Sequence, residues 1–180
     1  MKRVILNNKS FETYLTQSHI KARVSEIGLN IKNDFFGEEV VILGVLNGSF
    51  VFMADLVREI NMPVRCEFIR ISSYEGVATS GKVKTVLGLS LDIVGKNVII
   101  VEDIVDTGIS MNFLLSELHK KNPKRLAIAT LLFKKEAFRF NYALDYVGFE
   151  IPNKFVVGYG LDFDGLGRNL SDIYQLSTTQ

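Results

Sequence analysis

Two nearly continuous apolar runs, at residues 40–43 and 97–101, are the clearest pattern along the chain. Runs of this kind, bounded by glycine or polar residues, are typical of strands that are buried on both faces of a parallel sheet. Each run is followed by a turn of small residues and then by a segment with helical spacing, at 50–60 and 110–121. The second helix should end before Pro123, because proline cannot continue a helix. This repeated order of strand, turn and helix predicts βαβ units.

The rest of the chain adds shorter patterns around these units. Three further segments have strand-like patterns: residues 64–72, 126–133 and 155–157. Residues 73–84 contain two glycines and lack core positions, so we expect a mobile loop there, with a strand resuming over 85–91. An amphipathic helix is expected over 11–33 and an irregular tail over 163–180. Together the patterns predict an α/β fold with a central, mostly parallel sheet flanked by helices, and they leave the strand order open.

Composition narrows the classes of function without choosing one. The 180 residues are 47% hydrophobic, which is enough for one compact domain with a substantial core. A formal net charge of +1 argues neither for nor against a polyanionic partner, and the lack of a Lys/Arg stripe predicts no nucleic-acid partner. The single cysteine, Cys66, excludes a disulfide within the chain, and no Cys or His cluster indicates zinc. Neither a signal peptide nor a run of about 20 apolar residues is present, so we expect a cytoplasmic protein with no membrane partner.

The segment that carries chemistry is residues 98–110, which read VIIVEDIVDTGIS. A buried strand is expected to deliver Glu102 and Asp103 at its carboxyl end, where open α/β sheets bind ligands. Asp106 and the Thr-Gly pair after it then lie in the turn before a helix. Backbone N–H groups at a helix N-terminus form an anion cradle, and Gly108 lets the backbone approach a phosphate. The segment therefore predicts a phosphate-binding loop.

Three carboxylates beside a phosphate cradle need partners, because they would otherwise repel the phosphate. Sugar hydroxyls and Mg²⁺ are suitable partners, since Mg²⁺ prefers carboxylate and phosphate oxygens. The alternative is that these acids only cap a helix, where Asp and Glu are favoured in the first turn. Asp106 taken alone fits either interpretation, whereas the whole segment favours a ligand site.

The same segment resembles the phosphoribosyl pyrophosphate signature of the type I phosphoribosyltransferases. Other segments resemble the hypoxanthine/guanine branch of that family: residues 46–49, 71–74, 131–134, 147–152 and 154–162. The resemblance runs from about residue 40 to residue 170. It implies the type I phosphoribosyltransferase fold, as a single domain over 1–180 with a core at about 35–160 and a small hood from the N-terminal segment and the C-terminal tail. It also implies phosphoribosyl pyrophosphate and a 6-oxopurine base as substrates, Mg²⁺ as cofactor, and a homodimer or homotetramer.

The resemblance also implies a role for each matching residue. Asp106 lies against N7 of the purine as the general base or acid. The ribose and its 5′-phosphate are bound by Glu102, Asp103, Asp106, Thr107, Gly108, Ile109 and Ser110. The pyrophosphate is bound by Leu46, Asn47, Gly48 and Arg168. The purine is bound by Lys134, Phe155, Val156 and Asp162. Mg²⁺ is held by Glu102, Asp103 and Asp162, and the lid that closes over the site begins at Ser73 and Tyr74.

Base selectivity is expected to depend on Lys134. A lysine has three donors and no acceptor, so it suits the 6-oxo group and disfavours the amino group of adenine. Other interpretations of single residues remain open. Lys134 could be a surface lysine at a strand end, with Lys135 in its place, Phe155 could be an ordinary core residue, and Arg168 could be a solvated arginine of the tail.

Two residues depart from the pattern of the family. Asn47 stands where a lysine is common in the pyrophosphate turn, and Ile109 stands where a lysine is common in the phosphate loop. Ser110 keeps its hydroxyl. Backbone N–H groups can still bind the phosphates, so we expect weaker binding of phosphoribosyl pyrophosphate and not its loss.

Two alternative functions follow from these observations. One is a related enzyme that uses another base, such as xanthine or a pyrimidine. The other is a regulator with the same fold that binds nucleotide or RNA without significant turnover, which the two missing lysines favour. All four acids of the implied site are present, Glu102, Asp103, Asp106 and Asp162, and they favour the enzyme.

Overall fold

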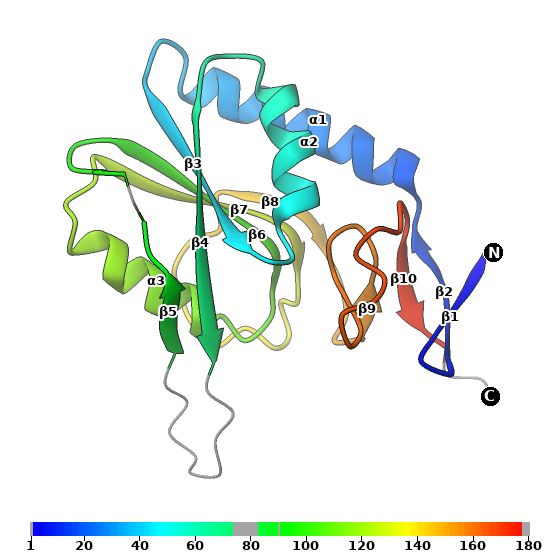
Figure 1. Ribbon diagram of the computed structural model, residues 1–180. Helices are drawn as coiled ribbons and strands as arrows, with labels where there is room; N and C mark the ends of the chain where they lie inside the picture. Colours follow the sequence, from blue (N-terminus) through cyan, green and yellow to red (C-terminus); the bar gives the residue numbers. More distant parts are fainter. Residues whose placement is uncertain (1, 74–82, 90, 178–180) are drawn as a thin grey trace.

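A six-stranded sheet forms the centre of the described chain, which comprises residues 2–73, 83–89 and 91–177 of a computed structural model (Figure 1). Its order is β5-β4-β3-β6-β7-β8. The strands are β3 (Val40–Leu46), β4 (Arg65–Ser73), β5 (Val83–Leu87), β6 (Asn97–Val105), β7 (Arg125–Phe133) and β8 (Tyr146–Glu150). Neighbouring strands from β4 to β8 are parallel, and β5 is antiparallel to β4. The predicted α/β fold with a mostly parallel sheet is confirmed.

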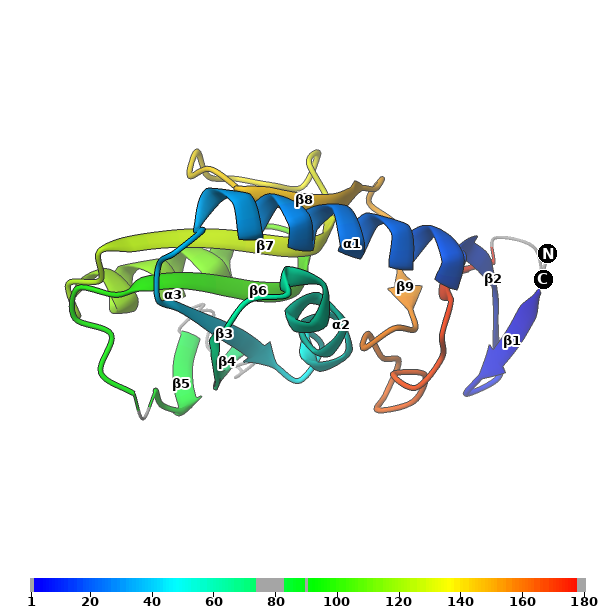
Figure 2. The same cartoon turned by 90° about the horizontal axis from the view of Figure 1, so that it is seen from above.

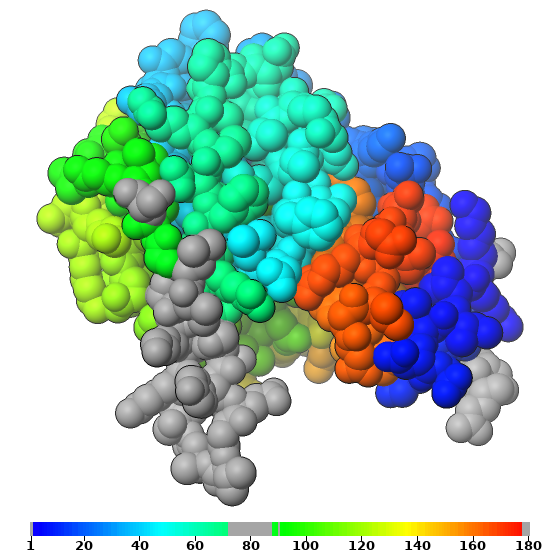
Figure 3. Space-filling model, viewed as in Figure 1, coloured from blue at the N-terminus to red at the C-terminus, as the bar shows by residue number. Residues whose placement is uncertain are grey.

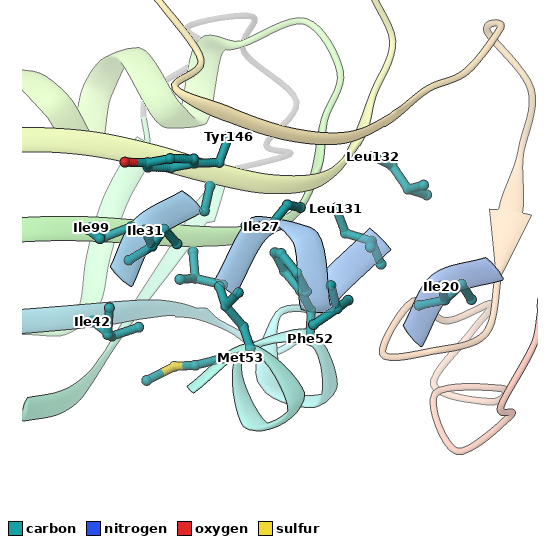
Figure 4. Packing of buried hydrophobic residues seen from close by; sticks show 14 of the residues in the cluster. Ile20, Ile27, Ile31, Ile42, Phe52, Met53, Ile99, Leu131, Leu132 and Tyr146 are labelled. Carbon is teal, nitrogen blue, oxygen red and sulfur yellow. The ribbon is translucent and has the colours of Figure 1, made fainter. Parts of the chain in front are cut away.

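Helices cover both faces of this sheet. Helices α1 (Gln17–Asp34) and α2 (Phe50–Ile60) lie on one face, and α3 (Ile109–His119) lies on the other (Figures 1 and 2). Side chains alternate along a strand, so Val40 and Ile42 of β3 pack toward α1 and α2, while Val41 and Leu43 pack toward α3. Figure 4 shows the first of these two core layers, with Ile42 and Ile99 of the sheet beside Ile27, Ile31, Phe52 and Met53 of the two helices. Burial on both faces explains why β3 and β6 have apolar sequences.

A second, smaller sheet joins the two ends of the described chain. It has the order β1-β2-β10-β9 and is antiparallel. Its strands are β1 (Arg3–Leu6), β2 (Lys9–Leu15), β9 (Val156–Val157) and β10 (Ile173–Leu176). Its own small core consists of Phe11, Val157 and Tyr174. Figures 1 and 2 place this sheet to one side of the large sheet, beyond the N-terminal end of α1.

The small sheet corrects three expectations. The amphipathic helix expected over 11–33 begins only at Gln17, after Thr16 caps it by accepting the His19 N–H at 3.4 Å, and residues 11–15 belong to β2. The tail expected to be irregular contains β10. The run at 155–157 lies in the small sheet and not in the parallel sheet. The physical reason is the same in each case, because these strands pair with partners far away in sequence, such as Glu12 with Gln175.

Element ends are otherwise close to expectation. Helix α3 ends at His119, before Pro123, as predicted. The strand expected over 85–91 is β5, which starts earlier and ends at Leu87. Of the expected loop at 73–84, Ser73 is the last residue of β4, and residues 74–82, including Tyr74, lie outside the described part of the chain. Within the described residues, no helix is long and apolar enough to cross a membrane.

Candidate active site

The site begins where β3 and β6 separate. The two strands pair in parallel only as far as Gly44 and Val101, whereas β6 continues alongside β7 to Val105. Glu102 and Asp103 therefore lie inside β6 and not at its end, which corrects the sequence-based placement. They lie on the edge that β3 has left free. The turn after β3, residues 46–49, occupies the same region, so the carboxyl ends of the two strands form one site.

Gly48 touches Asp103 closely. A Cβ atom on Gly48 would lie 1.5 Å from Oδ2 of Asp103, so only glycine fits at this position of the turn. On its other side the turn meets Gly160, whose Cβ would lie 2.1 Å from the carbonyl oxygen of Gly48. The peptide bond between Leu46 and Asn47 is cis. The pyrophosphate turn predicted from sequence thus lies between the acidic pair and the segment after β9, and Figure 3 shows that segment in orange against the cyan start of α2.

Glu102 and Asp103 share a poorly solvated position. Burial raises the pKa of the Glu102 carboxyl well above its ordinary value, and the neighbouring Asp103 carboxylate raises that pKa further. Burial also raises the pKa of Asp103, although hydrogen bonds with Glu102 and with the Ile104 N–H, which donates to Oδ1 at 2.9 Å, oppose the rise. Two adjacent carboxylates of this kind are suited to a hard cation, since a cation offsets both the burial and the repulsion. No group of three or more Asp, Glu, His or Cys side chains suited to a metal ion occurs in the described residues, so a cation here would need further oxygens from a substrate.

The predicted phosphate loop is residues 106–110. Gly108 precedes α3 with a φ of +83°, a left-handed conformation that glycine adopts readily. A cavity of about 110 Å³ lies at the loop, lined by Glu102 and residues 104–111. Ile109 is 43% exposed, and the Thr107 hydroxyl accepts the Ile109 N–H at 3.5 Å. The loop therefore offers backbone donors, hydroxyls and no cation.

Lys134 reaches Asp106 from the end of β7. Its Nζ lies 2.8 Å from Oδ2 of Asp106, and its side chain is only 11% exposed. Its backbone N–H donates to Val105 at 2.9 Å, which fixes its position beside β6. Lys135, in contrast, is exposed and pairs with Glu150 at 3.6 Å. Of the two neighbouring lysines, Lys134 faces the site, and the interpretation of it as a surface lysine is wrong.

Arg168 and Asp162 form a second ion pair. Nη2 of Arg168 lies 2.6 Å from Oδ1 of Asp162, and Nη1 donates to the Gly160 carbonyl at 2.7 Å. The other carboxylate oxygen of Asp162 accepts the Gly165 N–H at 2.7 Å. Arg168 is thus not a freely solvated tail residue. It lies beside the glycine that contacts the pyrophosphate turn.

Phe155 and Val156 come from the small sheet. The Phe155 side chain is 48% exposed, and its ring contacts Phe11 and Phe163 with centroid distances of 6.4 and 5.7 Å. Val156 is buried in β9, which pairs with β10. Phe155 is therefore supported from one side and open on another, which is compatible with stacking on a flat ring.

Sequence reasoning missed the residues that support the phosphate loop. Phe138 and Tyr142 lie against Gly108, and the Tyr142 hydroxyl donates to the Gly108 carbonyl at 2.9 Å. Burial raises the pKa of Tyr142 to about 12, and the charge of Glu102 adds to the rise, so the hydroxyl remains a donor. The alternation of aromatic residues at 138, 140 and 142 was the available signal. It was hard to interpret, because the described part of this segment forms neither a helix nor a strand.

Comparison with known proteins agrees with this geometry. The model of the phosphoribosyl transferase domain family matches residues 10–164. The chain belongs to this family and has its type I fold. The hypoxanthine-guanine phosphoribosyltransferase of Aquifex aeolicus is 42% identical over 173 residues, which cover 95% of this chain and 97% of that protein. The enzyme of the same name from Dictyostelium discoideum is 45% identical over 172 residues, or 93% and 96% of the two chains.

Solved structures with a similar fold and sequence come from the same branch of the family. A crystal structure of a hypoxanthine-guanine phosphoribosyltransferase from Bacillus anthracis has a TM-score of 0.87 and 44% identity, and covers 93% of this chain and 97% of that one. A hypoxanthine phosphoribosyltransferase from Staphylococcus aureus has a TM-score of 0.88 and 36% identity, with coverage of 92% and 91%. Within the family, the relatives of this chain are thus enzymes of the hypoxanthine-guanine branch, as its motifs indicated.

Proposed function

We propose that this protein transfers the 5-phosphoribosyl group from phosphoribosyl pyrophosphate to N9 of hypoxanthine or guanine, giving IMP or GMP and pyrophosphate. The observation that carries the proposal is the contact between Asp106 and Lys134 at 2.8 Å, directly beside a phosphate loop. In a 6-oxopurine base, N7 and O6 lie side by side on one edge of the ring system. A carboxylate and an ammonium group that lie next to each other therefore match this edge atom for atom.

Each member of the pair has its own task in the proposal. Asp106 accepts the proton of N7 as N9 attacks the anomeric carbon, and Lys134 donates to O6. Phe155 stacks on the purine, with the backbone of Val156 at its Watson–Crick edge. Because the two charged groups bind each other in the described structure, the arriving base takes the place of their mutual contact.

The sugar phosphate occupies the other side of Asp106. Residues 106–110 bind the 5′-phosphate through backbone N–H groups and hydroxyls. Glu102 and Asp103 bind the ribose hydroxyls and would hold Mg²⁺, which would supply positive charge beside the pyrophosphate. The turn of Leu46, Asn47 and Gly48 binds the pyrophosphate itself.

Asp162 and Arg168 are proposed to act after they separate. Asp162 would hold a second Mg²⁺, and Arg168 would bind the pyrophosphate. The present 2.6 Å contact between them supports this exchange, since it holds both side chains close to Gly160 and hence to the turn.

We propose that residues 1–180 form a single domain. The small sheet serves as a hood over the base, the core at about 35–160 carries the sugar phosphate, and residues 73 and 74 start a lid. We also propose that the protein forms a homodimer or a homotetramer and acts in the cytoplasm. The relatives disfavour a regulator without turnover, since they are named as transferases.

The experiment is a turnover assay with phosphoribosyl pyrophosphate, Mg²⁺ and a panel of four bases: hypoxanthine, guanine, xanthine and adenine. Hypoxanthine or guanine should react, and adenine should be rejected, because its amino group would face a donor-only lysine. Rejection through an unpaired buried polar group exceeds roughly 10³-fold in kcat/KM. Comparable efficiency with adenine would contradict the assignment of Lys134, and a preference for xanthine would favour the alternative base. No turnover with any base would favour the regulator.

A further inference from the structure

A short aromatic segment, residues 138–142, packs against the phosphate loop at Gly108. A Cβ atom on Gly108 would lie 2.6 Å from the Phe138 ring and 2.7 Å from the Tyr142 hydroxyl. The rings of Phe138 and Tyr142 pack edge to face, with centroids 5.0 Å apart, and Phe138 packs in the same way on Phe133 at 5.3 Å. The loop thus rests on a packed surface that is anchored to the end of β7.

Two hydrogen bonds join this segment to successive carbonyl groups of the loop. The Arg139 N–H donates to the Thr107 carbonyl at 3.2 Å, and the Tyr142 hydroxyl donates to the Gly108 carbonyl at 2.9 Å. A trans peptide unit is planar, with its C=O and N–H groups pointing in opposite directions. Holding the carbonyls of Thr107 and Gly108 therefore also orients the N–H groups of Gly108 and Ile109, which belong to the same peptide units. Tyr142 shares the Gly108 carbonyl with the Asn112 N–H of α3, which donates to it at 2.9 Å.

By the same planar geometry these two N–H groups face away from the aromatic segment, and the Ile109 N–H also makes a long contact of 3.5 Å with the Thr107 hydroxyl. The cavity of about 110 Å³ is lined by Glu102 and residues 104–111, and residues 138–142 do not line it. The segment consequently acts on the loop from the side opposite the cavity. Burial raises the pKa of Tyr142 to about 12, so its hydroxyl is protonated, and hence a donor, at neutral pH.

We propose that Tyr142 is a positioning residue that aims the backbone N–H groups of the loop at the 5′-phosphate. The inference rests on the proposed function, which places that phosphate at residues 106–110. It matters most in a chain with Ile109, because no cation at this position compensates for a misdirected N–H group. Tyr142 itself does not touch the substrate.

The test compares Tyr142→Phe with the unchanged protein by binding of GMP and of guanosine, which differ only in the 5′-phosphate. The variant keeps the ring and loses only the donor. GMP should bind about 3- to 10-fold more weakly, as expected for one net hydrogen bond, and guanosine should bind within about twofold of the unchanged protein. In steady-state assays the KM for phosphoribosyl pyrophosphate should rise by a similar factor, with the KM for hypoxanthine nearly unaltered.

Tyr146→Phe is the matched control. The Tyr146 hydroxyl also donates to an oxygen inside the protein, Oδ2 of Asp34 at 2.6 Å, but it does so on α1, away from the loop. This variant should leave the ratio of GMP to guanosine affinity unchanged. The inference is overturned if Tyr142→Phe weakens both ligands equally, if it weakens neither, or if the control changes the ratio as much. Because binding is measured without turnover, an inactive wild-type protein would contradict the proposed reaction while the ratio still decides the role of Tyr142.

Discussion

The phosphate loop and the small sheet are proposed to bind neighbouring parts of one ligand, yet the chain builds them in opposite ways. The loop comes from one continuous unit, β6 and α3, so its geometry follows from a local sequence. The small sheet combines strands from both ends of the described chain, with Glu12 paired to Gln175. A local unit can be recognised from its residues alone, whereas a sheet of this kind exists only once distant strands have found each other.

The two regions also differ in what holds them. The loop is held by hydrogen bonds and a packed aromatic surface, with Tyr142 donating to the Gly108 carbonyl. The small sheet has a core of three buried residues with a few partly buried neighbours. Because it buries so little apolar surface, we expect the sheet to be the more easily perturbed of the two regions.

The largest effect is expected in the phosphate loop, at Asp106. Asp106→Asn keeps the shape of the side chain and loses the proton acceptor. General acid–base catalysis contributes about 10² to 10⁴ in rate, so kcat should fall by that order while the affinity for phosphoribosyl pyrophosphate stays similar. Single-turnover kinetics with saturating substrates would measure this.

Asp92→Asn provides the control for that variant. Asp92 is likewise an aspartate outside the helices and strands, where it accepts the Val94 N–H at 3.0 Å, and it lies outside the proposed site. If Asp106→Asn has the same chemical rate as Asp92→Asn, then Asp106 is only a turn residue that precedes a helix.

A smaller effect is expected from Gly48→Ala. The added carbon would lie 1.5 Å from Oδ2 of Asp103, so the turn or the carboxylate has to move. Overpacking costs about 1–3 kcal/mol, which corresponds to roughly 5- to 150-fold in kcat/KM for phosphoribosyl pyrophosphate. Gly88→Ala is the matched control, since in the described part of the chain nothing beyond its two sequence neighbours lies within 4 Å of the added carbon. Equal kinetics for the two variants would show that the close approach is not needed for binding.

The smallest effect concerns the two missing lysines, and it is a gain. Asn47→Lys or Ile109→Lys would add a charge-assisted hydrogen bond to a phosphate, worth about 1.5–3 kcal/mol when it is buried and less at a position that is 43% exposed, as Ile109 is. The KM for phosphoribosyl pyrophosphate should fall about 3- to 10-fold, with the KM for the purine nearly constant.

Asn47→Gln and Ile109→Met separate charge from side-chain length in these experiments. If the neutral variants lower the KM as much as the lysines do, packing and not charge is responsible. If no variant tightens the sugar substrate, the backbone cradle is sufficient on its own. A shift in the purine KM instead would mean that these turns bind the other substrate.

Elements built from neighbouring residues could be predicted from the sequence, whereas those that pair distant segments could not. The apolar runs of β3 and β6 and the helices after them were predictable, because burial on both faces leaves a continuous apolar sequence. The segment 98–110 was recognisable because the strand, the acids and the turn are adjacent. Residues 11–15 of β2 were mistaken for the start of a helix, since the partner strand β10 is remote in sequence.

Contacts between side chains were predictable only in part. That Lys134 and not Lys135 faces the site depends on where β7 ends, which is a matter of one residue. The pairing of Asp162 with Arg168 and the support of Gly108 by Tyr142 depend on turns with left-handed residues, such as Asp164 at a φ of +49°. Such turns have no periodic pattern of apolar and polar residues, so the directions of the side chains that they carry could not be predicted from the sequence.

The pairing of Glu12 with Gln175 has a consequence for the newly made chain. Synthesis proceeds from the N-terminus, and domains fold as their parts emerge. Strand β2 precedes the strands of the large sheet along the chain, but its partner β10 follows all of them. Until β10 is made, the edge of β2 that does not pair with β1 is therefore open to other nascent chains, while β3, β6 and α3 can already pack. Within the described chain the small sheet is thereby the last part to form, so the support that Phe11 and Phe163 give to the Phe155 ring is completed only after Asp106, Lys134 and the loop before α3 have been made.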